Sequence, residues 1–262
     1  LIGSKGQMLN ARRSIDFREL IEKNVDIVLQ MPSLFDKVEQ CLTTGDLVAA
    51  SAILENTASF RVYFESVFKR IKFEIPYDGK DITVAANMLG IDLFRSIVLS
   101  YFIFLKSPKT YRVFNLKIID LIEFNSKILS DWVSIINTFD DKFRAYLPFA
   151  SYSLACLIIC EKLFSIYPYP VSDIVLYSDV SYNKILQKRY GFSLWEIVLK
   201  AMNMEQNSLS EDDRKMLYYF KILLSYEASR PEFYEFGIDK ILDVSVHADM
   251  QSIIFIKKAL QK

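Results

Sequence analysis

Residues 115–136 read NLKIIDLIEFNSKILSDWVSII, and the periodicity of this stretch identifies the structural class of the chain. Its apolar side chains recur every three or four residues, which is the spacing of one face of an α-helix. Asn115 stands just before the stripe and is the predicted N-cap, because its short side chain can accept a free backbone N–H. The stripe comprises Ile118, Leu121, Ile122, Ile128, Leu129, Trp132, Ile135 and Ile136.

The same helical spacing continues on both sides of this segment, and capping residues predict where the other helices begin. Breaks are expected at the turn 76–79, at Ser107-Pro108 and at 167–170, and 72–76 is the only candidate for a short extended piece. Seven glycines and seven prolines in 262 residues argue against a loop-rich or all-β fold, so the chain is predicted to be all-α. The predicted caps are Ser33 for a helix over 34–42, Asp46 for 47–54, Asp92 for 93–105, Ser193 for 194–204, and Ser210 with Asp213 for 214–228.

Composition narrows the class of protein further. Hydrophobic residues make up 52% of the chain and aromatic residues 14%, which is ample material for the core of one large domain or two closely packed small ones. Lys plus Arg equals Asp plus Glu at 32 each, so the chain lacks the basic footprint of a nucleic-acid binder. Three cysteines form no disulfide framework, which favours a reducing, cytoplasmic location.

No membrane span is expected. The longest apolar run, Ile97–Leu105, is interrupted only by Ser100. It is too short to cross a bilayer, which takes about 20 residues, so it is predicted to be a helix buried on all sides. The polar N-terminal segment also lacks the pattern of a secretory signal.

Two regions carry a family resemblance. The first runs from Met31-Pro32-Ser33-Leu34 through the segment 82–91, ITVAANMLGI, into the apolar helix after it. The second joins 114–132 with 147–164, and 185–186 and 195–202 match later helices of the same pattern. These regions resemble the HDOD family, bacterial signalling domains related to metal-dependent HD phosphohydrolases. The resemblance implies an HDOD-type domain over 15–207, with an N-terminal helical bundle (15–110) packed on a degenerate HD-like core (111–207). A C-terminal helical extension (208–262) would pack on that core.

The resemblance also implies that the metal centre is lost. An HD phosphohydrolase holds its metal with a histidine, a His-Asp pair and a distant aspartate. The alignment places the first histidine near Asn125 and the His-Asp pair near Leu154-Ala155. The only histidine of the chain, His247, lies outside the matched region, and Cys156 and Cys160 lack neighbouring ligands. We therefore expect no metal site, no cofactor and no catalytic residue.

The predicted function is that of a non-catalytic bacterial signal-transduction module, which binds a protein partner or a small ligand. Two alternatives remain open. One is a diverged hydrolase of the HD superfamily with a residual acid–base pocket around Asp120, Glu123 or Glu161; the other is a helical scaffold with an apolar ligand pocket. Glu161 follows an apolar run, and a buried carboxylate there would suit acid–base chemistry. Lys162 beside it favours a helix turning toward solvent, and Glu123 is spaced to pair with Lys127 on a solvated face.

Overall fold

The computed structural model describes residues 27, 30–71, 80–166, 210–238 and 249–261, and every regular element in these ranges is helical. No strand occurs among them, which confirms the all-α prediction. The predicted extended piece at 72–76, the break at 167–170, the helix after Ser193 and His247 lie outside the described residues.

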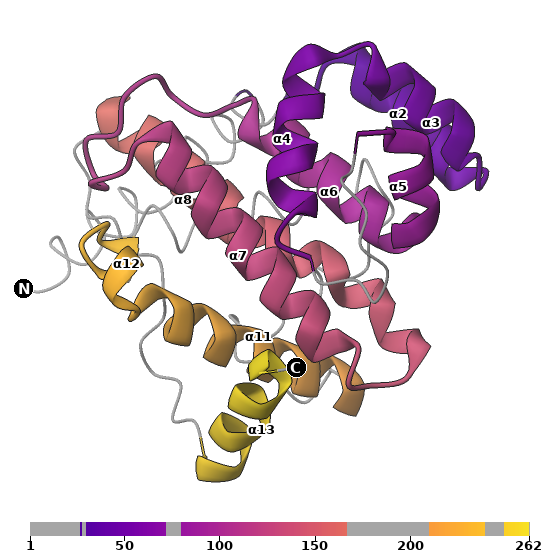
Figure 1. The fold of residues 1–262 in the computed structure, drawn as a ribbon. Coiled ribbons are helices and arrows are strands. Elements are labelled where there is room, and N and C mark those ends of the chain that lie inside the picture. Colours follow the sequence, from indigo (N-terminus) through magenta and orange to yellow (C-terminus); the bar gives the residue numbers. More distant parts are fainter. Residues whose placement is uncertain (1–26, 28–29, 72–79, 167–209, 239–248, 262) are drawn as a thin grey trace, which may run out of the picture.

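The helices vary from one turn to five turns in length (Figure 1). Their bounds are α2 (Ser33–Thr43), α3 (Leu47–Glu55), α4 (Ala58–Phe68), α5 (Ile82–Leu89), α6 (Ile91–Phe104), α7 (Ile118–Ile136), the 3₁₀ helix η1 (Asp141–Phe149), α8 (Ala150–Ile166), α11 (Glu211–Ala228), α12 (Pro231–Tyr234) and α13 (Met250–Gln261).

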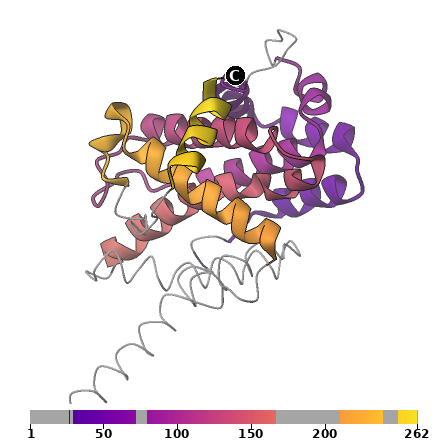
Figure 2. The same cartoon turned by 90° about the horizontal axis from the view of Figure 1, so that it is seen from below.

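Helix α7, the segment with the clearest apolar stripe, lies at the centre of the described structure. It packs on α4 and α8 and, from the other end of the chain, on α11 and α13. Figures 1 and 2 show α11 and α13 together on one side of α7. Helix α6 packs on α8 and η1, and α2, α3 and α5 complete the N-terminal end. One continuous apolar cluster runs through these contacts, because helices that carry a wide apolar face must bury it against neighbours. The predicted division at residue 110 stays a prediction.

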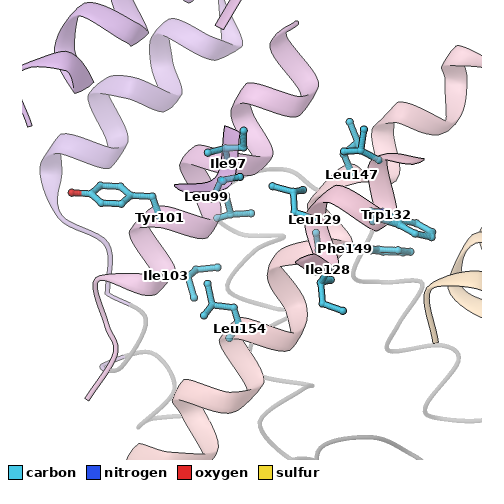
Figure 3. Close-up of a cluster of buried hydrophobic side chains, with 14 of the residues drawn as sticks. Ile97, Leu99, Tyr101, Ile103, Ile128, Leu129, Trp132, Leu147, Phe149 and Leu154 are labelled. Atoms are coloured by element: carbon cyan, nitrogen blue, oxygen red, sulfur yellow. The ribbon is translucent and has the colours of Figure 1, made fainter. Parts of the chain in front are cut away.

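Trp132 marks the point where α7, η1 and α11 meet. Its side chain is fully buried, and its Nε1–H donates to the Tyr146 carbonyl at 2.9 Å. The indole lies 6.2 Å from the ring centroid of Phe149 and 5.1 Å from that of Phe220. Figure 3 shows Trp132 and Phe149 side by side in the core. One residue thus joins the middle of the chain to its C-terminal part.

Two of the predicted caps are confirmed. Asp46 accepts the Ala49 N–H at 2.8 Å at the start of α3. At the start of α11, Ser210 Oγ accepts the Asp213 N–H at 3.1 Å, and the Asp213 carboxylate accepts the Ser210 N–H at 3.3 Å. This reciprocal pair is a capping box, so α11 begins at Glu211, three residues earlier than predicted.

Three predicted helix starts are wrong. Helix α7 begins at Ile118 with Lys117 as its N-cap. Asn115 lies two residues before this cap, and its backbone N–H donates to the Phe236 carbonyl at 3.2 Å. Helix α6 begins at Ile91, because Gly90 forms the joint between α5 and α6. Gly90 has a φ of +75°, a backbone conformation that would be strained in a residue with a side chain. Ser33 is the first residue of α2, and Pro32 is its N-cap.

The capping box of α11 gives a direct test of helix stability. We expect Ser210→Ala to lower the free energy of unfolding by about 1 kcal/mol, because the Asp213 N–H loses the Ser210 Oγ acceptor at the helix start. Urea denaturation followed by far-UV circular dichroism measures the change. Ser134→Ala, inside α7, is the matched control and should lose no stability, since alanine is the better helix former. Equal losses in the two variants would contradict the capping role.

One helical stretch in the described part of the chain is long and apolar enough to cross a membrane, Asp141–Leu163. This stretch is longer than the 97–105 run on which the sequence prediction rested. Of its most apolar window, 83% is buried inside the protein, as in the core helix of a globular fold. It is therefore no clear membrane span.

Candidate functional site

The position predicted for the first metal-binding histidine holds a buried amide. Asn125 lies on the core side of α7, and its Nδ2 donates to the Tyr63 hydroxyl of α4 at 2.9 Å. Burial raises the pKa of Tyr63, so its hydroxyl stays protonated. The Asn125 Oδ1 has no hydrogen-bond partner among the described residues. A neutral amide held by a phenol can order two helices, but it is a much poorer ligand for a transition metal than imidazole.

The positions predicted for the His-Asp pair hold apolar side chains. Leu154 and Ala155 lie on α8, and both are buried. Figure 3 shows Leu154 beside Ile103 of α6 in the zone where α6, α7 and α8 pack together. Neither side chain carries a donor atom for a metal or a proton. These two positions therefore contribute packing and no chemistry.

Glu161, the leading acid–base candidate, is buried and fully engaged. Its carboxylate accepts the backbone N–H groups of Arg112, Val113 and Phe114, with bonds of 2.8 Å to Val113 and 3.3 Å to Phe114. The predicted turn of this residue toward solvent is wrong. Glu161 fixes the segment between α6 and α7 onto α8, and it satisfies three backbone N–H groups of this segment, of which that of Phe114 belongs to a buried residue.

The other two candidate carboxylates serve the surface of α7. Asp120 accepts the Lys117 N–H at 2.8 Å and so caps the helix. Glu123 is exposed and lies 3.7 Å from the guanidinium of Arg70. The predicted pairing of Glu123 with Lys127 is wrong, because Lys127 Nζ donates to a different carboxylate. Asp120, Glu123 and Glu161 are thus held by three different sets of partners and form no common pocket wall in the contacts of the described residues.

A pair of carboxyl groups that the sequence analysis missed lies between α7 and α11. Asp131 of α7 is 5% exposed and Glu227 of α11 is fully buried, and the two side chains are hydrogen-bonded to each other. Lys127 Nζ donates to both Asp131 oxygens, at 2.6 and 2.7 Å. On the other side, Arg230 lies 3.3 Å from both Glu227 oxygens and 2.7 Å from Glu232.

Burial and the neighbouring Asp131 raise the pKa of Glu227 to about 7. Removal from water disfavours its anion, and the hydrogen bond and charge of Asp131 disfavour it further. Lys127 and Arg230 act in the opposite direction but more weakly. Glu227 therefore stays protonated to a higher pH than an ordinary glutamate, and the neutral acid can donate a hydrogen bond to Asp131.

A signal for this pair exists in the sequence. Asp131 falls inside the apolar stripe of α7, and Glu227 follows Phe220, Leu223 and Leu224 at helical spacing. A carboxylate on the apolar face of each of two helices predicts a buried polar contact, because a lone buried charge is too costly to persist. The sequence alone does not say which two helices meet.

The described residues contain no group of three or more His, Cys, Asp or Glu side chains that could hold a metal ion. Cys156 and Cys160 are buried on α8. No family model matches the chain, and no curated protein and no solved structure matches it.

Proposed function

We propose that this chain is a non-catalytic bacterial signal-transduction module of the HDOD type, which acts in the cytoplasm by binding a protein partner or a small ligand. Support comes first from the segment that carries the resemblance. In α5, Ile82, Ala85, Ala86 and Leu89 form one buried face. Gly90 then joins α5 to α6, and α6 is buried along nearly its whole length.

The observation that carries the proposal is the chemistry of three positions. Where the resemblance puts metal ligands, the chain has the amide of Asn125 and the aliphatic side chains of Leu154 and Ala155, all buried. Leucine and alanine can neither ligate a metal nor move a proton. A protein with these residues keeps the helical framework of such a domain while its surfaces remain available for binding.

The alternative of a residual acid–base pocket loses its best candidate. Glu161 accepts three backbone N–H groups, and a carboxylate so occupied is a structural tie. A scaffold that binds an apolar ligand differs from the proposed module only in what it binds, so a ligand assay separates the two.

Metal titration and a hydrolysis assay on the purified full chain test the proposal. We expect no tight binding of Mn²⁺, Fe²⁺ or Ni²⁺ by calorimetry, and no hydrolysis of bis(p-nitrophenyl) phosphate above the buffer rate with any of them. A catalytically active HD phosphohydrolase serves as the positive control. A tightly bound metal together with phosphodiesterase activity would overturn the non-catalytic assignment.

Native mass spectrometry of the freshly purified chain addresses the binding role. A discrete mass increase that disappears on denaturation would reveal a bound small ligand. A polar or charged ligand supports a signalling module, whereas a lipid or other apolar molecule supports the scaffold alternative.

A further inference from the structure

We propose that the Asp131–Glu227 pair is a proton-dependent latch that holds α11 and α12 on α7. The latch is a device of the C-terminal helices and does not depend on the HDOD assignment. It sits at the centre of a contact between two helices, the first of which ends at Ile136 and the second of which begins at Glu211.

The contact between α7 and α11 has apolar ends and a polar middle. At one end Trp132 packs edge-on against Phe220, and at the other Phe124 packs edge-on against Phe233, with ring centroids 5.1 and 5.2 Å apart. The carboxyl pair lies between these two aromatic contacts in the sequence of each segment. A polar group enclosed in this way has no access to bulk water while the helices are packed.

The charges around the pair balance only when one carboxyl is neutral. Among the described residues, the groups that act on Glu227 are Asp131 and Lys127 from α7 and Arg230 from the joint between α11 and α12. Lys127 pairs with Asp131, and Arg230 pairs with the partly exposed Glu232 of α12. Arg230 also contacts both Glu227 oxygens at 3.3 Å, so this cation is shared between Glu227 and Glu232. With Glu227 ionised, two cations would face three carboxylates, one of them fully buried.

Among the residues that the structure describes, Tyr226 is the remaining ionisable group that acts on this cluster, and it acts on Arg230 rather than on Glu227. Elsewhere, α11 is tied to η1 near its N-terminus, where Tyr146 donates to Asp213 at 2.5 Å and Lys142 donates to Asp212 at 2.6 Å. Those bonds are independent of Glu227, so loss of the latch frees the C-terminal half of α11 and α12 while the first turn stays attached.

The direction of the pH effect follows from the raised pKa of Glu227. Below its ordinary pKa of 4.5, the group is protonated whether or not the helices are packed, and its contribution to docking is fully present. Between 4.5 and about 7, the packed form holds a proton that the open form releases. Docking therefore weakens as the pH rises through this window, by up to tenfold per pH unit in the equilibrium constant.

Hydrogen exchange of the full chain, read by mass spectrometry at pH 5.5 and 7.5, tests the latch. Protection factors, corrected for the intrinsic pH dependence of exchange, are compared between peptides of 222–234 and peptides of α6. We expect the protection of 222–234 to fall about tenfold or more at pH 7.5, while that of α6 changes little. Equal pH responses in the two regions would overturn the proposal.

Variants identify the group responsible. Glu227→Gln keeps the hydrogen bond of the neutral acid, so 222–234 should stay protected at both pH values; a pH response like that of the unmodified chain would overturn the proposal. Glu123→Gln, on the exposed face of α7, is the matched control and should leave the response intact. If Glu227→Gln fails to fold, Asp131→Asn replaces it. That variant should move the loss of protection to lower pH, and an unchanged profile would count against the latch.

Discussion

Replacing Trp132 with alanine is expected to lower the free energy of unfolding by about 3–5 kcal/mol, the range seen when a buried large aromatic is removed. The indole is fully buried and contacts Phe149 and Phe220, so its loss opens a cavity at the junction of α7, η1 and α11. The Tyr146 carbonyl also loses the Nε1–H that it accepts. Urea denaturation monitored by far-UV circular dichroism gives the size of the loss.

Two further variants separate the contributions of Trp132. Trp132→Phe keeps most of the packing but removes the hydrogen bond, and it should cost less than half as much as the alanine variant. Tyr234→Ala truncates an aromatic that is 71% exposed on α12, and it should change the free energy of unfolding by less than about 0.5 kcal/mol. A Trp132→Ala loss as small as that of Tyr234→Ala would show that this junction is not packed as described.

Replacing Glu161 with alanine is expected to cost about 3 kcal/mol or more. Hydrogen bonds to a charged acceptor contribute about 1.5–3 kcal/mol each, and a buried donor left without a partner costs about 1–3 kcal/mol. Three backbone N–H groups depend on this one carboxylate, and water that enters the cavity would recover part of the loss. Urea denaturation measures the global effect, and hydrogen exchange of residues 112–114 measures the local one.

Glu161→Gln is the informative partner of this variant, because the amide keeps one acceptor oxygen and turns an NH2 group toward the other donors. It should fall between the unmodified chain and Glu161→Ala in stability. Glu123→Ala, on the exposed face of α7, is the matched control and should lie within about 0.5 kcal/mol of the unmodified chain. Fast exchange at 112–114 in the unmodified chain would mean that the carboxylate does not hold this segment.

The helical class was predictable because the three-and-four spacing of apolar residues requires only local information. The starts at Asp46 and Ser210 were predictable for the same reason, since a cap is made within four residues. Asn115 was misread because the N-cap of α7 lies two residues later, at Lys117, where the Asp120 carboxylate accepts the Lys117 N–H. Asp92 was misread because the positive φ of Gly90 places the helix start two residues earlier, at Ile91.

The candidate site was only partly predictable. Burial of Leu154 and Ala155 follows from the apolar run around them. The sequence around Glu161 was compatible with a buried carboxylate and with one that faces solvent. The partners that bury it are backbone N–H groups about fifty residues earlier, and backbone groups cannot be recognised from residue type. The contact between Asp131 and Glu227 depends on α11 packing against α7. The sequence of one helix alone does not specify which distant helix of the chain packs on it.

During synthesis on the ribosome, the central helix α7 is made well before one of the helices that cover it. Helix α7 ends at Ile136, but α11, which covers its face at Trp132, ends at Ala228. At synthesis rates of about 5–20 residues per second, the apolar side of the nascent α7 waits on the order of ten seconds for α11. During that interval the incomplete nascent chain exposes an apolar helix face that can associate with other chains. Slower translation of the last third of the message would therefore raise the aggregated fraction of newly made protein.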